Sequence, residues 1–219
     1  MASTAKIQIE GQNLVSSLQG FFKTLLQAEE ISALLVAQHL PMKNAVMPTL
    51  VTDPAKLDGA DPLAPVFPIN AAKVVSRLTR KPLKGKVAAV LRPCEIRAFI
   101  ELVKLKQGSV EDVILIGMDC LGAYSNVNYP HFAEDNGTEA TAQFYSNIQT
   151  GKGTAHNGFD VSPACKACEY PIPQNADLLI GLLGADTNDH LLLKANTEAG
   201  ETLLESLALP ATKEPSSRA

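Results

Sequence analysis

Apolar and polar residues alternate along the chain in blocks that predict both strands and helices. Short, almost continuously apolar runs indicate buried strands, and apolar residues at a spacing of three and four indicate amphipathic helices. The predicted strands cover residues 31–40, 45–52, 87–91, 112–117, 177–183 and 191–196. The predicted helices cover residues 14–28, 70–78, 94–107 and 198–207, with shorter ones near 54 and 139–149.

Strand, helix and strand follow one another within residues 87–117, which is the pattern of a parallel βαβ unit. Pro48 lies inside a predicted strand and indicates an edge or a bulge there. We therefore predict an α/β fold with a mixed, largely parallel sheet, flanking helices and a cysteine-bearing loop region. Residues 1–209 form one domain in this interpretation, residues 123–163 are mainly a long polar loop, and 210–219 form a disordered tail.

Composition and charge exclude several classes of protein. The 219 residues suffice for one large or two small domains, and 46% of them are hydrophobic. A net charge of −4 argues against nucleic-acid binding, which requires a basic surface. No apolar run reaches the roughly 18 residues of a membrane span, and the first residues lack the apolar segment of a signal peptide. We expect a cytoplasmic protein.

Four cysteines are the main candidates for chemistry. Cys94 and Cys120 each follow a predicted buried strand, and parallel strands would place both at the same edge of the sheet. Cys165 and Cys168 form a Cys-x-x-Cys pair in a predicted loop. Disulfide frameworks are rare in cytosolic proteins of this size, so metal or redox chemistry is the better interpretation.

A Cys-x-x-Cys pair alone fits zinc, an iron–sulfur cluster or a dithiol redox site. A zinc ribbon normally offers two such pairs, whereas Cys94 and Cys120 are single and far apart in sequence. Dispersed ligands favour a cluster held across several loops. Three basic residues beside the cysteines, Arg92, Arg97 and Lys166, would stabilise its negative charge. Zinc, or four buried thiols without a ligand, remain alternatives at this stage.

Other catalytic patterns are missing from the sequence. Neither nucleotide-binding glycine motif occurs. The histidines are isolated, and His39 on an apolar strand is expected to be a hydrogen-bonded residue of the core. Any chemistry would therefore depend on a bound cofactor.

Four segments together resemble the beta subunit family of deazaflavin-coenzyme-reducing hydrogenases and formate dehydrogenases. They are the strand and Pro-Cys turn of residues 85–96, the strand ending in Cys120, the Cys165–Cys168 motif, and the Ala-Asp-strand-Gly segment of residues 176–184. Their order and spacing hold together over roughly residues 14–207. The resemblance is to a short form without the N-terminal ferredoxin-like segment of larger members.

The resemblance implies an electron-transfer subunit with one 4Fe–4S cluster on the four cysteines and an FAD nearby. Its partners would be other subunits of a redox complex with a hydrogenase, formate dehydrogenase or heterodisulfide-reductase-type enzyme, and a soluble hydride carrier. Candidate flavin contacts lie near predicted strand ends. They are Met47, Pro48 and Thr49, the loop of residues 61–68, Arg92 and Pro93, and the segment from Gly181 to Gly184.

Two other functions fit the same sequence. One is a cluster-only relay or adaptor subunit that docks larger enzymes and has no activity of its own. The other is a structural zinc-binding or metal-free scaffold.

Overall fold

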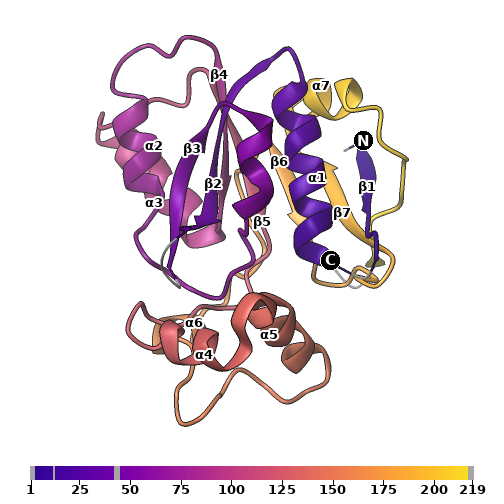
Figure 1. The fold of residues 1–219 in the computed structure, drawn as a ribbon. Coiled ribbons are helices and arrows are strands. Elements are labelled where there is room, and N and C mark those ends of the chain that lie inside the picture. Colours follow the sequence, from indigo (N-terminus) through magenta and orange to yellow (C-terminus); the bar gives the residue numbers. More distant parts are fainter. Residues whose placement is uncertain (1–2, 12, 42–44, 217–219) are drawn as a thin grey trace.

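A seven-stranded sheet forms the centre of the protein, as Figure 1 shows. The computed structural model describes residues 3–11, 13–41 and 45–216. Across the sheet the strands follow the order β1-β7-β6-β5-β4-β2-β3. Their bounds are β1 (Thr4–Gln8), β2 (Ile31–His39), β3 (Val46–Val51), β4 (Lys86–Leu91), β5 (Val113–Met118), β6 (Leu178–Gly181) and β7 (His190–Ala195).

The central strands are parallel and the outer ones are antiparallel to their neighbours. Strands β2, β4, β5 and β6 run in one direction, and they lie side by side in that order. Strand β3 pairs antiparallel with β2, β7 with β6, and β1 with β7. The predicted α/β class with a mixed, largely parallel sheet is therefore confirmed, and the carboxyl ends of four strands share one edge.

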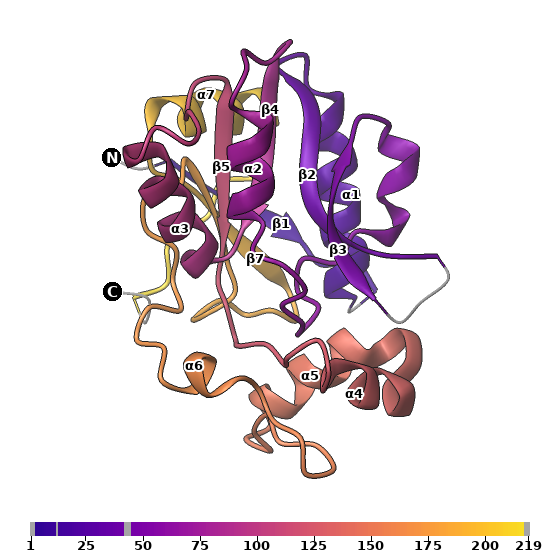
Figure 2. The same ribbon diagram turned by 90° about the vertical axis from the view of Figure 1, so that its left-hand side faces the viewer.

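Helices cover both faces of the sheet, which explains why strands β4 and β5 are apolar on both sides. Helices α1 (Leu14–Gln27) and α7 (Glu198–Ser206) pack on one face. Helices α2 (Ala72–Leu78) and α3 (Pro93–Lys104) pack on the other, where Figure 2 shows them in front of β4 and β5. Within the described residues, none of the helices is long and apolar enough to cross a bilayer.

The helix ends follow local signals in the sequence. Asn13 caps α1 by accepting the backbone N–H of Ser16, and Thr197 caps α7 by accepting that of Gly200. Asp53 accepts the N–H of Ala55 and starts the short 3₁₀ helix η1 (Pro54–Gly59), whose first residue is proline.

Residues between β5 and β6 form a separate lobe beyond the carboxyl ends of the strands, and both ribbon views show it there. It contains α4 (Tyr129–Asn136), η2 (Gly137–Glu139), α5 (Ala140–Gln149) and α6 (Pro163–Lys166). An aromatic cluster of Tyr124, Phe132 and Phe144 fills its interior. Of these elements the pattern predicts only α5.

The two edges of the sheet differ from its centre. Pro48 lies in edge strand β3, as predicted, because an edge position tolerates the missing N–H. At the other edge, Lys6 of β1 donates to the carbonyl of Pro210, and Thr212 donates to that of Thr4. Residues up to Thr212 therefore have backbone partners in the structure, beyond the predicted domain end at residue 209.

Candidate metal centre and adjoining pockets

Three separate segments bring the four cysteines to the carboxyl edge of the sheet. Cys94 is the second residue of α3, directly after β4. Cys120 is the second residue after β5, Cys165 lies in α6, and Cys168 is the second residue after that helix. The first three thiols are half-buried and Cys168 is exposed. The group is thus open to solvent on the side of Cys168.

The thiols lie close enough to influence one another's pKa. Burial raises the pKa of the Cys94 thiol from 9.0 to about 11, with smaller upward effects from Glu95, Cys120 and Cys165. Burial likewise raises the pKa of Cys120, and the charges of Cys165 and Cys168 add to this effect. A Cβ on Gly122 would lie 3.6 Å from the Cβ of Cys165, so the α6 segment packs directly against the turn after Cys120.

The described residues do not gather the thiols into a single-ion site. In the part of the chain that the structure describes, no three His, Cys, Asp or Glu side chains converge tightly enough to hold one metal ion. Tetrahedral zinc, with Zn–S distances of about 2.3 Å, needs sulfur atoms within roughly 4 Å of one another. A cubane of four irons is larger, and four thiols on separate segments are the donor set that such clusters use.

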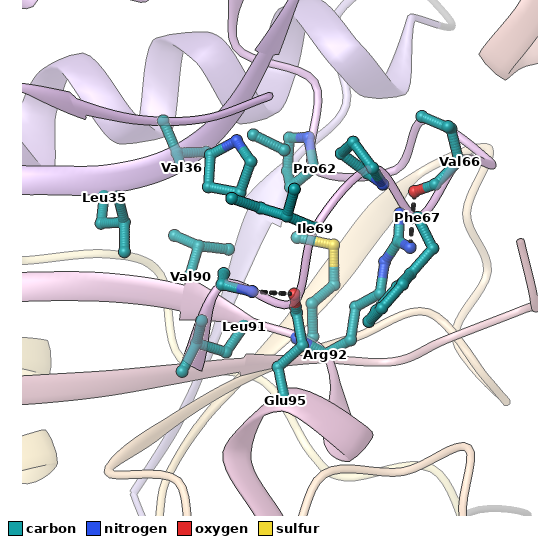
Figure 3. Close-up of a pocket in the computed structure, with 15 residues that line it drawn as sticks. Leu35, Val36, Pro62, Val66, Phe67, Ile69, Val90, Leu91, Arg92 and Glu95 are labelled. Atoms are coloured by element: carbon teal, nitrogen blue, oxygen red, sulfur yellow. Dashed lines mark hydrogen bonds between the residues drawn. The ribbon is translucent and has the colours of Figure 1, made fainter. Parts of the chain in front are cut away.

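Arg92 is a basic residue whose charge acts on the thiols. Its guanidinium lowers the pKa of both Cys94 and Cys120, against the larger effect of burial. It donates to the carbonyls of Val66 and Ala64, at 2.7 and 2.6 Å, which Figure 3 shows for Val66. Because these partners are uncharged carbonyls, the positive charge of Arg92 remains available to the thiols.

Glu95 fixes the backbone that carries Arg92 and Cys94. Its carboxylate is buried and accepts the backbone N–H of Arg92 at 3.0 Å and that of Ala71 at 2.8 Å. The first contact closes the amino end of α3, and the second ties that end to the start of α2. The position of Cys94 is therefore set by a buried hydrogen-bonded carboxylate.

The other two predicted basic neighbours have different partners. The guanidinium of Arg97 lies 5.0 Å from the ring centre of Tyr170, in a cation–π contact. Lys166 forms an ion pair with Asp160. Of the three, Arg92 is the residue that ranks among the main causes that act on the pKa of Cys94 and Cys120.

A narrow pocket holds some of the predicted flavin contacts, as Figure 3 shows. Pro48, Arg92 and members of the 61–68 loop line it, together with Glu95. Its volume is about 30 Å³, room for about one water molecule. A flavin ring does not fit there in this conformation.

The remaining flavin candidates lie outside the lining of this pocket. Met47 and Thr49 are the neighbours of Pro48 in β3, and Pro93 is buried as the first residue of α3. Gly181 ends β6, and Gly184 follows in a turn with a φ of +77°. The segment between these two glycines is held by Asp119, which accepts the N–H groups of Leu182 and Leu183.

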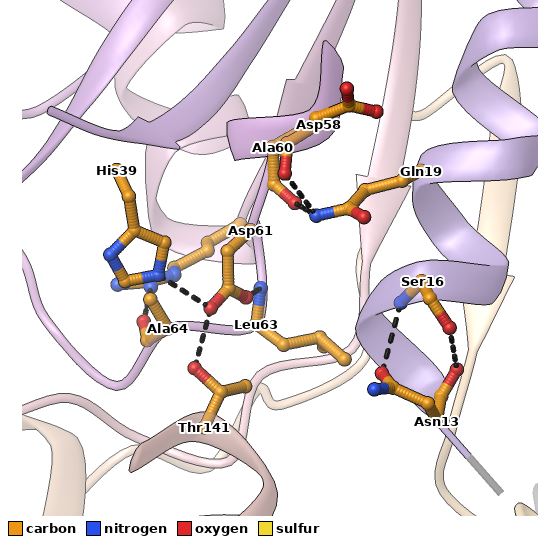
Figure 4. Close-up of polar contacts among 11 residues, drawn as sticks. Asn13, Ser16, Gln19, His39, Asp58, Ala60, Asp61, Leu63, Ala64 and Thr141 are labelled. Atoms are coloured by element: carbon orange, nitrogen blue, oxygen red, sulfur yellow. Dashed lines mark hydrogen bonds and ion pairs between the residues drawn. The ribbon is translucent and has the colours of Figure 1, made fainter. Parts of the chain in front are cut away.

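A larger hollow of about 900 Å³ lies between α1, the end of β2 and the lobe. Asp61 lines this hollow, and Figure 4 shows the hydrogen-bonding partners of Asp61. The buried carboxylate accepts from the Thr141 hydroxyl at 2.5 Å and from the N–H of Leu63 at 3.1 Å, and it lies 2.9 Å from Nε2 of His39. Burial and the charge of Asp61 raise the pKa of Tyr129, which lines the same hollow.

The structure corrects the interpretation of His39. The residue has a hydrogen-bonding partner, as predicted, but 44% of its side chain is exposed and it does not belong to the core. It is the last residue of β2, and it lines the larger hollow together with residues at the start of α1. The partner Asp61 lies in the 61–68 loop that the sequence singled out for a different reason.

The raised thiol pKa leads to a first prediction. In the protein without bound metal, alkylation of Cys94 by iodoacetamide should rise about tenfold per pH unit up to pH ~11, because the thiolate is the nucleophile. Peptide mass spectrometry at each pH measures the rate, and the exposed Cys168 serves as the accessible reference thiol. A rate for Cys94 that levels off near the ordinary value of 9.0 would contradict the assigned burial.

The same shift affects stability at high pH. The unfolded chain loses the Cys94 proton at about its ordinary value of 9.0, whereas the folded chain keeps it to about 11. The stabilisation is therefore complete below pH 9.0 and is lost as the pH rises to about 11.

The fold and the thiol group together define a class: an α/β protein that carries a cysteine-rich site at the carboxyl edge of a parallel sheet. Residues 84–212 match the family model for the C terminus of the beta subunit of coenzyme F420 hydrogenase/dehydrogenase. This match covers more than half of the chain, which therefore belongs to that family. The family resemblance predicted from the sequence is confirmed.

Two relatives carry formate dehydrogenase names. The chain is 25% identical over 206 residues to the F420-dependent formate dehydrogenase subunit beta of Methanocaldococcus jannaschii, covering 86% of the chain and 53% of that protein. It is 26% identical over 141 residues to the F420-dependent formate dehydrogenase 1 subunit beta of Methanococcus maripaludis, covering 55% of the chain and 36% of that protein. The chain thus spans about half or less of the length of these relatives.

A solved structure shares the fold. A chain of the F420-reducing [NiFe] hydrogenase complex from Methanosarcina barkeri superposes with a TM-score of 0.61 at 12% identity. The match covers 98% of this chain and 81% of that one. At this identity the likeness supports the fold alone.

Proposed function

We propose that this chain binds one 4Fe–4S cluster through Cys94, Cys120, Cys165 and Cys168 and transfers single electrons within a multi-subunit oxidoreductase. The observation that carries the proposal is the placement of the four cysteines, which three segments bring to one edge of the sheet, where the thiols influence one another's pKa. When bound, a cluster of this type takes up and gives out one electron at a time.

The protein's own residues suit this role. Cys94 and Cys120 come from the rigid ends of β4 and β5, so two of the four ligands are held by the sheet. Arg92 lowers the pKa of both thiols and therefore favours the thiolates that a cluster requires. The same positive charge would stabilise the additional negative charge of a reduced site.

The exposed side of the group indicates where electrons would enter or leave. Cys168 is exposed while the other thiols are half-buried, so a redox partner can approach the group most closely on that side. The names of the relatives suggest the partners. We propose that the chain works with other subunits of a formate dehydrogenase or hydrogenase and with coenzyme F420 as the soluble hydride carrier.

FAD is part of the proposal as the group that would link a hydride carrier to a one-electron carrier. The narrow pocket of Pro48 and Arg92 is too small for it in this conformation. The hollow of about 900 Å³ beside Asp61 falls within the range of roughly 300–1,000 Å³ that ligand sites occupy. If the chain binds flavin, this hollow is the better candidate.

Metal and flavin analysis tests the proposal. The full chain is purified without oxygen, and iron, acid-labile sulfide, zinc and acid-released flavin are measured per chain. About four irons and four sulfides per chain, with visible absorption that dithionite bleaches, would support the cluster. Cluster without flavin would favour the relay or adaptor role, and a colourless protein with zinc would exclude the proposal.

Single serine substitutions give the second prediction. Cys94→Ser and Cys120→Ser should each lose most of the bound iron and sulfide, because each removes a thiolate from the strand ends that hold the site. Ser162→Ala, beside the third thiol segment, is the matched control and should keep the wild-type content. Iron that remains at the wild-type level in both serine variants would show that these thiols are not ligands.

A further inference from the structure

Gly117, near the end of β5, packs against the segment that follows Cys168. A Cβ at this position would lie 2.5 Å from the Cβ of Pro173 and 2.9 Å from the Cβ of Ala176. Both distances are shorter than any ordinary contact between carbon atoms. The segment that follows Cys168 therefore lies against the bare backbone of Gly117.

Hydrogen bonds hold the same segment along β5 on both sides of this contact. The backbone N–H of Cys120 donates to the carbonyl of Pro171 at 2.9 Å. The N–H of Asp177 donates to the carbonyl of Leu115 at 2.8 Å, and the Asp177 carboxylate accepts the N–H of Leu115 at 2.8 Å. Residues 171–177 thus contact the chain at Leu115, at Gly117 and at Cys120, that is, before, at and after the glycine.

We propose that Gly117 is a positioning residue that sets the place of Cys168 relative to Cys120. Its missing side chain lets the 171–177 segment lie directly on β5, the strand that leads to Cys120. Pro171, whose carbonyl accepts a hydrogen bond from the N–H of Cys120, lies only three positions after Cys168. The distance between the two thiols therefore depends on how closely this segment approaches β5.

A side chain at position 117 should move the segment rather than the strand. Strand β5 is hydrogen-bonded on both sides, where Gly117 is paired with Leu91 of β4 and Leu179 of β6, and all six of its residues are buried. Within the 171–177 segment, Pro173 and Ala176 are buried where they meet Gly117, whereas every residue from 166 to 170 is exposed. Because the segment continues directly into these exposed residues, its displacement would be transmitted to Cys168.

Thiol bridging in the cluster-free chain tests this proposal directly. In a Cys94→Ser/Cys165→Ser background only Cys120 and Cys168 remain, and dibromobimane becomes fluorescent when it bridges the two. Gly117→Ala should slow the bridging by roughly tenfold, since cross-links between cysteines are highly sensitive to the separation of their Cα atoms. Each thiol should still react with iodoacetamide at the rate found with Gly117.

Gly108→Ala is the matched control. A Cβ at Gly108 would lie 3.0 Å from Oγ1 of Thr79 and 3.2 Å from the Cα of Ser76, so it also crowds its neighbours. This glycine follows α3 rather than β5, and its neighbours belong to the end of α2. The control should lose stability and keep the bridging rate, which separates a general loss of stability from a displaced thiol.

Two further variants complete the test. Gly117→Ala with Pro173→Gly removes the closest of the clashing atoms and should bridge faster than Gly117→Ala alone. If Gly117→Ala does not fold, Pro173→Gly alone carries the test, because it removes the same contact without a clash and should also slow bridging. Bridging at the rate of the parent chain in Gly117→Ala, or in Pro173→Gly where that variant replaces it, would overturn the proposal.

The meaning of this contact for electron transfer rests on the function proposed above, but the bridging experiment does not. The measurement uses thiols and a thiol reagent only, in the absence of iron. A chain that bridges as expected and binds no cluster would leave the role of Gly117 intact and refute the redox function. A chain that binds the cluster but whose Gly117→Ala variant bridges at the parent rate would refute the role of Gly117 and leave the redox function intact.

Discussion

Gly200→Ala should lower the free energy of unfolding by about 3 kcal/mol, the upper end of the usual cost of overpacking. A Cβ at Gly200 of α7 would lie well inside van der Waals contact with the carbonyl oxygen of Asp177 and 2.8 Å from its carbon. This carbonyl already accepts the N–H of Asn196 at 2.9 Å, so it cannot turn away without losing a hydrogen bond. The helix would instead have to lift off the sheet.

Urea unfolding monitored by circular dichroism measures this effect. The control is Gly20→Ala in α1, where a Cβ would meet nothing within 4 Å. There the change should raise the stability by about 0.5–1 kcal/mol, since alanine favours a helix over glycine. Equal urea midpoints for Gly200→Ala and the wild type would contradict the close contact between α7 and residue 177.

Asp61→Ala should also cost about 3 kcal/mol, because it leaves several buried or half-buried donors without an acceptor. The lost partners are the Thr141 hydroxyl, the N–H of Leu63 and His39 Nε2. Thr141 belongs to α5, so the substitution also removes a link between the lobe and the sheet. Amide hydrogen exchange in α5 should therefore accelerate more than exchange in the central strands.

Asp58→Ala is the matched control for this variant. Asp58 lies three positions earlier and pairs with Lys23 at 2.5 Å, but 77% of its side chain is exposed. Exposed ion pairs contribute roughly 0–1 kcal/mol, so the control should change the stability little and leave exchange in α5 unaltered. Similar losses of stability in the two variants would mean that the buried hydrogen bonds of Asp61 stabilise the protein no more than an exposed ion pair does.

The sheet and its covering helices could be predicted because their signals are local. Strands β4 and β5 are continuous apolar runs, and α1 shows a clear apolar stripe with an asparagine cap. Helix α4 was not predicted because it is short and buries only three residues, Tyr129, Phe132 and Ala133. A pattern of that length does not stand out within a polar segment.

The candidate site was predictable in part for a similar reason. Each of Cys94 and Cys120 follows an apolar strand, so the topology alone brings them to one edge. The network of Asp61 left no comparable signal, since His39 and Thr141 lie 22 and 80 positions away from it. Gly117 and Gly200 are likewise ordinary glycines in the sequence, because the backbone and side chains that approach them come from distant segments.

The tyrosines of this protein are all confined to the segment between β5 and β6, at Tyr124, Tyr129, Tyr145 and Tyr170, and the chain has no tryptophan. Ultraviolet emission excited near the phenol absorption band therefore originates from that segment alone, while the sheet and its covering helices contribute none. The protein thus contains an intrinsic optical probe of the region that carries Cys165 and Cys168. Emission and far-ultraviolet dichroism, recorded together, would report separately on this region and on the rest of the fold.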